Sequence, residues 1–88
     1  MKIDINFNGY ENETGFVYTW YNGFSIQSEI SDNSIHICAN KQGLLSLAAN
    51  LIALAQDNVP NGTHLELDEF NALEDNSKNL VIEKYNGL

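Results

Sequence analysis

The sequence has no arginine and only four lysines, against twelve aspartate and glutamate residues, which gives a formal net charge of -8. Phosphate groups and anionic lipids bind basic surfaces, because such binding depends on charge attraction and on counterion release. The sequence therefore predicts no nucleic-acid partner and no membrane partner. A macromolecule that binds this chain through charge is expected to be basic.

Cysteine is nearly absent as well, because Cys38 is the only thiol and no disulfide can form within the chain. Small secreted domains usually depend on disulfides for their stability. The N-terminal residues alternate polar and apolar side chains and form no apolar run of signal-peptide length. The longest apolar-rich stretch, residues 44–55, is too short to cross a bilayer. We therefore expect a cytoplasmic protein.

Length and composition favour one small folded domain over residues 1–88. Hydrophobic residues make up 43% of the chain, which is enough to build a core. Chains divide into separate cores only well above this length. A domain of this size buries a limited part of its surface, so we do not expect a deep enzyme cavity.

Alternating polar and apolar residues predict an antiparallel β-meander in the first half of the chain. Its expected strands are residues 3–7, 16–21, 24–30 and 35–39. The pairs Asn22-Gly23 and Asp32-Asn33 are typical of two-residue hairpin turns. In the second half of the chain, residues 63–67 and 80–85 are predicted to form two further strands.

Between these strand regions, leucine and alanine recur at helical spacing from about Lys41 to Gln56, with Asn40 as the expected N-cap. The apolar stripe of this helix, with Leu47 and Leu51 at its centre, is expected to be buried against the sheet. The predicted fold class is therefore α+β. It consists of an antiparallel β-meander sheet with one amphipathic helix packed on one face, followed by two further strands.

The expected register gives the meander two faces. The face expected to receive the helix carries Val17, Thr19, Tyr21, Phe24, Ile26, Ile30, Ile35, Ile37 and Ala39. The other face places Phe16, Tyr18 and Trp20 among polar side chains. Because one helix covers one face, these aromatic residues either form a partner-binding patch or pack beneath residues 69–79 or the N-terminal strand.

His64, Glu66 and Asp68 alternate along one expected strand, so their side chains point to the same side. Such a set could hold zinc or manganese, with His36 or Cys38 as a further ligand. Any half-buried strand shows the same alternation, however, and no nucleophile elbow or glycine-rich phosphate loop is present. We predict no metal and no cofactor. A small metal- or thiol-dependent enzyme that uses these residues is the alternative.

Three segments read ICANKQGLLSLA (37–48), GTHLELD (62–68) and LEDNSKNLVIEK (73–84). Together they resemble the immunity protein 32 family of bacterial polymorphic toxin systems. In that family a strand and an A-N-K-x-G-L motif lead into a Leu/Ala helix, and a G-x-H-x-H-L-D strand follows. Glu66 stands where the pattern has its second histidine and Asn76 where it has glycine, which weakens a metal site further.

The resemblance, which covers about residues 35–84, implies a stoichiometric, non-enzymatic protein that binds and neutralises a cognate bacterial toxin. Combined with the charge and the expected register, it gives these partner-binding residues: Tyr18, Trp20, Glu29, His64, Glu66 and Asp68. The structural motif residues are Asn40, Gly43 and Ser77. A structural or regulatory subunit with another partner is a further alternative. An open strand edge would also allow a homodimer.

Overall fold

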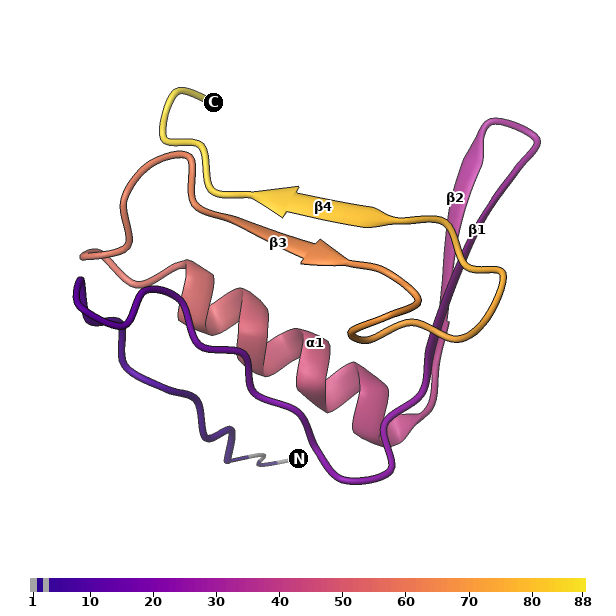
Figure 1. Cartoon of the computed structure of the whole chain (residues 1–88), viewed down its shortest axis with the longest axis horizontal. Helices are drawn as coiled ribbons and strands as arrows, with labels where there is room; N and C mark the ends of the chain where they lie inside the picture. The colour runs from indigo at the N-terminus through magenta and orange to yellow at the C-terminus, as the bar shows by residue number, and fades with distance from the viewer. Residues whose placement is uncertain (1, 3) are drawn as a thin grey trace.

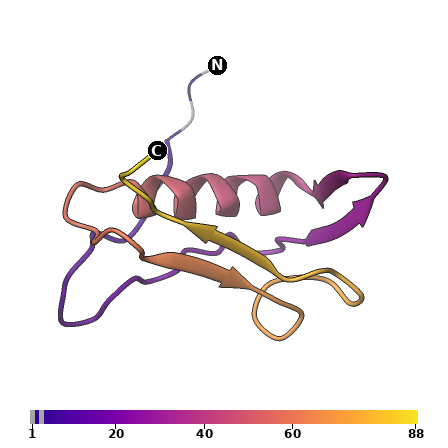
Figure 2. The ribbon, with the colours of Figure 1, turned by 90° about the horizontal axis from the view of Figure 1, so that it is seen from above.

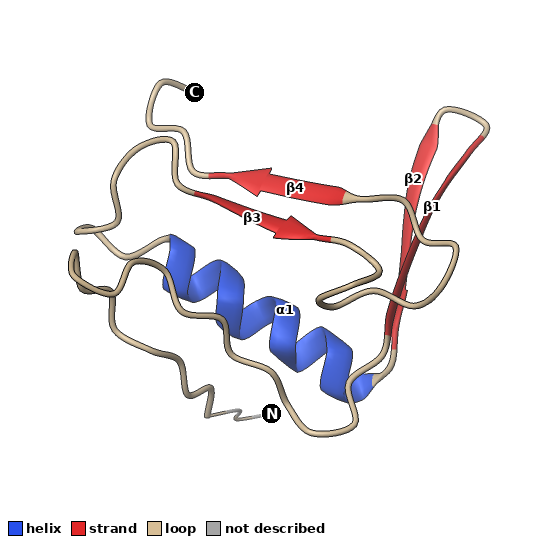
Figure 3. Ribbon diagram, viewed as in Figure 1, coloured by secondary structure: helices blue, strands red, loops and turns tan. Residues whose placement is uncertain are grey.

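The structure, a computed structural model that describes residues 2 and 4–88, contains one α-helix and two strand pairs (Figures 1 and 3). The elements are β1 (Ile26–Ser31), β2 (Ser34–Ala39), α1 (Lys41–Leu54), β3 (His64–Leu67) and β4 (Leu80–Glu83). β1 pairs with β2, and β3 pairs with β4, both antiparallel. This arrangement confirms the α+β class, with one helix and two further strands after it.

The β1–β2 hairpin has the predicted register. Ile30 lies opposite Ile35, and Ser28 lies opposite Ile37. The turn residues Asp32 and Asn33 have φ angles of 48° and 66°, which are the left-handed values that a type I′ turn requires. Aspartate and asparagine adopt this conformation more readily than other non-glycine residues, so the local sequence sets the register.

The predicted strand at residues 16–21 is wrong. The Asn22-Gly23 turn does form, with φ 83° at Gly23 and a 3.1 Å hydrogen bond from the Phe24 N–H to the Tyr21 carbonyl. No strand ladder continues from it. The segment instead runs extended beside α1, and α1 covers one side of a layer that contains this segment, β3 and β4 (Figures 1 and 2).

Polar side chains of the helix replace the missing strand ladder. The amide of Asn50 accepts from the Thr19 N–H at 2.8 Å and donates to the Thr19 carbonyl at 3.0 Å. The hydroxyl of Ser46 accepts from the Tyr21 N–H at 2.8 Å. Buried backbone groups need hydrogen-bond partners, and here a helix supplies them instead of a strand.

The N-terminal segment follows the same principle. Ile3, in the first predicted strand, lies outside the described residues, and residues 2 and 4–10 contain no strand. Gln56 accepts from the Tyr10 N–H, and Asn58 donates to the Tyr10 carbonyl at 3.0 Å. Side chains that follow α1 therefore hold this segment.

The helix starts as predicted but presents a different face to the core. Asn40 caps it, accepting from the Gly43 N–H at 2.8 Å. Its buried residues are Gly43, Ser46, Ala49, Asn50, Ala53 and Leu54. Leu47 is half-buried and packs against the core cluster that contains Ile26, whereas Leu51 is 43% exposed, so the predicted burial is only partial at Leu47 and wrong at Leu51. The contacts of Ser46 and Asn50 with the extended segment place their side of the helix toward the core, which leaves Leu44 and Leu51 exposed while Leu54 is buried. Among the described residues, no helix is long and apolar enough to cross a membrane.

The core consists of two adjoining clusters. One contains Ile26, Leu67, Ala72 and Leu73, and the other contains Leu54, Val59 and Leu65. Tyr18 packs against both clusters. The predicted sheet face is only partly buried, because Ile30, Ile35 and Ile37 are exposed. These residues lie toward the end of the hairpin that projects beyond the helix (Figure 1).

Candidate partner-binding site

The structure gathers several of the predicted binding residues around Glu66 on β3. The Glu66 N–H donates to the Tyr18 hydroxyl at 3.2 Å, and the Glu66 carboxylate lies 3.0 Å from Nε2 of His64. The Asn71 amide donates to the Glu66 carbonyl at 2.7 Å. Asp68 follows directly after β3. Glu29 belongs to the other strand pair, on β1.

His64 responds to this carboxylate. The Gly62 carbonyl, 3.3 Å from Nδ1, and then Glu66 favour the protonated ring and raise the pKa of His64 above 6.5. The imidazolium forms a salt bridge with Glu66 when it is protonated. A fall in pH therefore adds a positive charge at His64 and makes this surface less negative.

Asp68 builds a tight turn after β3. Its carboxylate accepts from the Phe70 N–H at 2.8 Å and from the Asn71 N–H at 3.1 Å. The Asn71 side chain accepts from the Asp68 N–H at 2.8 Å, and the Leu73 N–H donates to the Asp68 carbonyl at 2.8 Å. These bonds leave Phe70 at the tip, with its side chain 97% exposed.

Sequence reasoning missed Phe70. A single aromatic residue in a polar stretch has no periodicity that would reveal its role. The spacing of Asp68 and Asn71 does carry a signal, because Asx side chains commonly bond to backbone groups two or three residues away. That signal predicts a rigid turn with Phe70 near its tip.

The turn belongs to a strongly acidic segment, residues 66–77, which we call the acidic loop. Residues 66–77 contain no lysine and carry five carboxylates, at Glu66, Asp68, Glu69, Glu74 and Asp75. Lys78 directly follows the segment, and Lys84, further along the chain, donates to the carbonyls of Gln56 and Val59 at 2.6 and 2.9 Å. The segment therefore creates a negative potential that attracts cationic groups.

The far end of this segment is fixed along β1. The Glu74 N–H donates to the Ile26 carbonyl at 2.8 Å, and the Lys78 N–H donates to the Ser28 carbonyl at 3.0 Å. The buried hydroxyl of Ser77 accepts from the Ser28 N–H at 3.2 Å. Backbone and side-chain bonds thus tie the loop to the protein at both of its ends.

The aromatic residues of segment 16–21 form a stack. Tyr18 and Trp20 stack with ring centroids 5.6 Å apart, and Trp20 stacks on Phe24 at 4.7 Å. The predicted register placed Trp20 and Phe24 on opposite faces, which is wrong because residues 16–21 do not enter the sheet. Tyr18 and Trp20 are half-buried and pack against the core, so they expose much less of their surface than Phe70 does.

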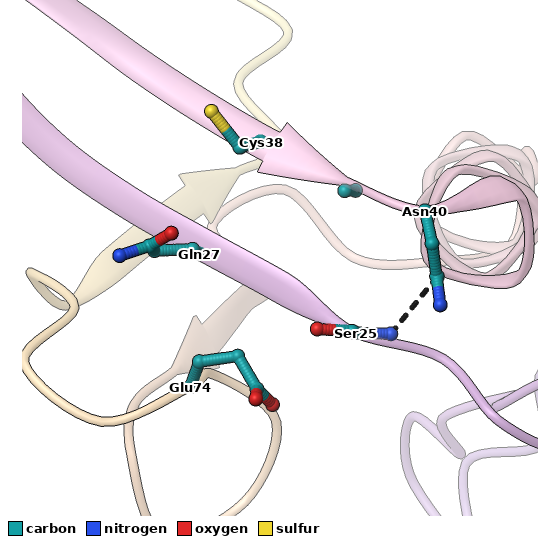
Figure 4. A pocket seen from close by; sticks show the side chains of 6 residues that line it. Ser25, Gln27, Cys38, Asn40 and Glu74 are labelled. Atoms are coloured by element: carbon teal, nitrogen blue, oxygen red, sulfur yellow. Dashed lines mark hydrogen bonds between the residues drawn. The ribbon is translucent and has the colours of Figure 1, made fainter.

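The residues of the alternative enzyme site do not converge. Cys38 is exposed at a hollow of about 430 Å³ whose lining also includes Gln27 and Glu74 (Figure 4). His36 and Cys38 lie on β2, whereas His64 lies on β3, in the other strand pair. Within residues 2 and 4–88, no three His, Cys, Asp or Glu side chains form a group that could hold a metal ion.

A hydrogen-bonded loop that exposes one large aromatic side chain among polar groups has the make-up of a protein-binding surface, which is an apolar anchor with a polar rim. The family model of immunity protein 32 matches residues 34–85, more than half of the chain, and the chain belongs to this family. No curated protein and no solved structure matches it significantly. Membership of a family of immunity proteins indicates a toxin-neutralising role. The matched range contains β3 and the acidic loop but not Tyr18, Trp20 or Glu29.

Proposed function

We propose that this protein neutralises a cognate basic toxin by binding it stoichiometrically through an acidic face. We define the acidic face as His64, Glu66, Asp68, Glu69 and Phe70. The observation that carries the proposal is Phe70, which is almost fully exposed in a hydrogen-bonded turn among carboxylates. Exposing a phenyl ring to water does not stabilise the free protein. Burying that ring in an apolar pocket of a partner stabilises the complex.

Rigidity and charge have separate effects on binding. Because the Asp68 carboxylate already holds the backbone of the turn, little conformational freedom is lost when a partner covers Phe70. Carboxylates around such an anchor accelerate encounter with a basic surface. The anchor itself slows dissociation. Blocking the toxin in this way requires no turnover by the immunity protein.

The half-buried aromatic residues Tyr18 and Trp20 lie between the core and this face and hold Glu66 in position. The Tyr18 hydroxyl accepts from the Glu66 N–H, and Trp20 stacks on the Tyr18 ring. Loss of either ring would first disturb the core clusters and the position of Glu66. Glu29, on the projecting hairpin, would contribute at the rim or through long-range attraction.

The test is to co-express the chain with the protein encoded beside its gene, and to measure binding of purified variants to that protein. Phe70→Ala is expected to weaken binding by about 30-fold, corresponding to about 2 kcal/mol, mainly through faster dissociation. Leu44→Ala is the matched control, because Leu44 is an exposed apolar residue on α1. It should leave binding unchanged.

Charge is tested separately. Glu69→Gln should slow association and reduce its dependence on salt, whereas Glu13→Gln, which removes an exposed carboxylate near the N-terminus, should have a smaller effect. If Phe70→Ala binds as tightly as the unaltered protein, the acidic face is not the binding surface. If no basic partner binds at all, the proposed function itself is wrong.

A further inference from the structure

The outer edge of β2 has unsatisfied hydrogen-bonding groups. The carbonyls of Ile26 and Ser28 on β1 accept bonds from the acidic loop, so these residues direct their backbone groups away from β2. Their antiparallel partners on β2, Ala39 and Ile37, therefore direct their own N–H and C=O groups away from β1. Ile35 lies two residues before Ile37 on the same strand, so its backbone groups also point away from β1. Among the described residues, no backbone hydrogen bond reaches the outward groups of Ile35 or Ile37.

This edge also lacks the features that usually protect edge strands. Lysines, prolines and bulges prevent edges from pairing with other chains. Residues 33–40 contain none of the four lysines, none of the twelve carboxylates and no proline, although the chain carries a net charge of -8. Ile35 and Ile37 are 72% and 45% exposed along the strand.

The geometry points to a homodimer in which β2 pairs antiparallel with β2 of a second copy, about a twofold axis at Ile37. In this register Ile35 lies opposite Ala39 of the second copy, and His36 lies opposite Cys38. The outward N–H and C=O groups of residues 35, 37 and 39 are then all paired across the interface. The two hairpins form one four-stranded sheet.

The charge distribution favours a second copy of this chain over a basic partner as the chain that pairs with β2. Two chains of net charge -8 repel each other, but residues 33–40 carry no carboxylate, so two β2 strands can pair without placing carboxylates opposite each other. A basic partner is attracted instead to the acidic loop, which bonds to β1 on the side opposite β2. The dimer therefore leaves the acidic loop of each copy uncovered.

Sedimentation equilibrium over a range of protein concentrations tests the association. The unaltered chain should approach twice the 9.8 kDa mass of one copy as concentration rises. Ile37→Lys places two like charges at the axis and should raise the dimer dissociation constant at least about tenfold. Ile52→Lys is the matched control, because Ile52 is a 43% exposed residue near the C-terminal end of α1, whereas β2 leads into the N-terminal end of this helix. It should not alter the dimer.

Disulfide formation tests the register without depending on the fold of the lysine variant. Under mild oxidation, His36→Cys should give cross-linked dimers, because the new thiol faces Cys38 of the second copy in a closely spaced pair. The unaltered chain should not cross-link, since its two Cys38 residues are diagonal neighbours at about 7–8 Å. The proposal is wrong if the protein is monomeric throughout, if only Ile52→Lys separates the copies, or if His36→Cys cross-links no faster than the unaltered chain.

Discussion

Asn50 and Leu51 are neighbours on α1, and the structure predicts that replacing the polar residue costs more stability. Asn50 is 1% exposed and joins the helix to both backbone groups of Thr19. Leu51, the next residue along the helix, is 43% exposed. The apolar stripe in the sequence predicts the reverse order, so the two alanine variants distinguish the two arrangements.

The magnitudes follow from the contacts. Asn50→Ala removes two hydrogen bonds, each of which contributes about 0.5–1.5 kcal/mol, and leaves the Thr19 N–H and carbonyl without partners. Because Thr19 is half-buried, water can satisfy part of this loss, and we expect a total cost of about 2–4 kcal/mol. Leu51→Ala removes apolar surface that is already partly in water and should cost about 1 kcal/mol.

Urea unfolding of both variants, followed by circular dichroism, measures the two free energies. Hydrogen exchange gives an independent local measure, because Asn50→Ala should deprotect the Thr19 amide while Leu51→Ala leaves it protected. An equal or larger cost for Leu51→Ala would mean that the leucine stripe faces the core. The placement of segment 16–21 beside α1 would then be wrong.

Three further predictions concern single positions. The pKa of His64, measured by NMR titration, should lie above 6.5 and fall in Glu66→Gln. Because folding raises this pKa, the stabilisation from His64 should be complete below pH 6.5 and disappear as the pH rises through the folded value; unfolding of His64→Gln at several pH values tests this. Gly43→Ala should destabilise the protein by about 1–3 kcal/mol despite better helix propensity, because the new methyl group would meet the Ser25 carbonyl oxygen at 2.5 Å; thermal unfolding measures this loss. Asp68→Ala should accelerate hydrogen exchange at Phe70 and Asn71 while leaving β4 protected.

The sequence was informative where neighbouring residues decide the structure. Asp32-Asn33 predicts the turn and thereby the register of β1 and β2, and Asn40 predicts the start of α1. These features depend on local φ angles and on a side chain that bonds within one helical turn. The strands β3 and β4 likewise follow from short alternating segments.

The sequence was misleading where polar residues make distant contacts. Ser46 and Asn50 interrupt the apolar stripe of α1, and in sequence they look like tolerated polar positions. In the structure they bond to Tyr21 and Thr19, which lie 25 and 31 residues away. No pattern within a single segment shows such a contact, so the sequence alone predicts that residues 16–21 lie in a sheet. The charge of the acidic face was predictable from composition, whereas the exposure of Phe70 depends on the turn at Asp68.

The distribution of polar and apolar residues favours a protein that is completed by association. Buried Asn50, Ser46 and Ser28 make hydrogen bonds, while Phe70, Ile35 and other large apolar side chains lie in water. Water-exposed apolar surface contributes little to the stability of the free chain. A partner that covers it adds stability by mass action, by about 2.7 kcal/mol when its concentration is a hundredfold above Kd. The same exposed residues that limit the stability of the isolated chain therefore couple its folding to the binding of its partners.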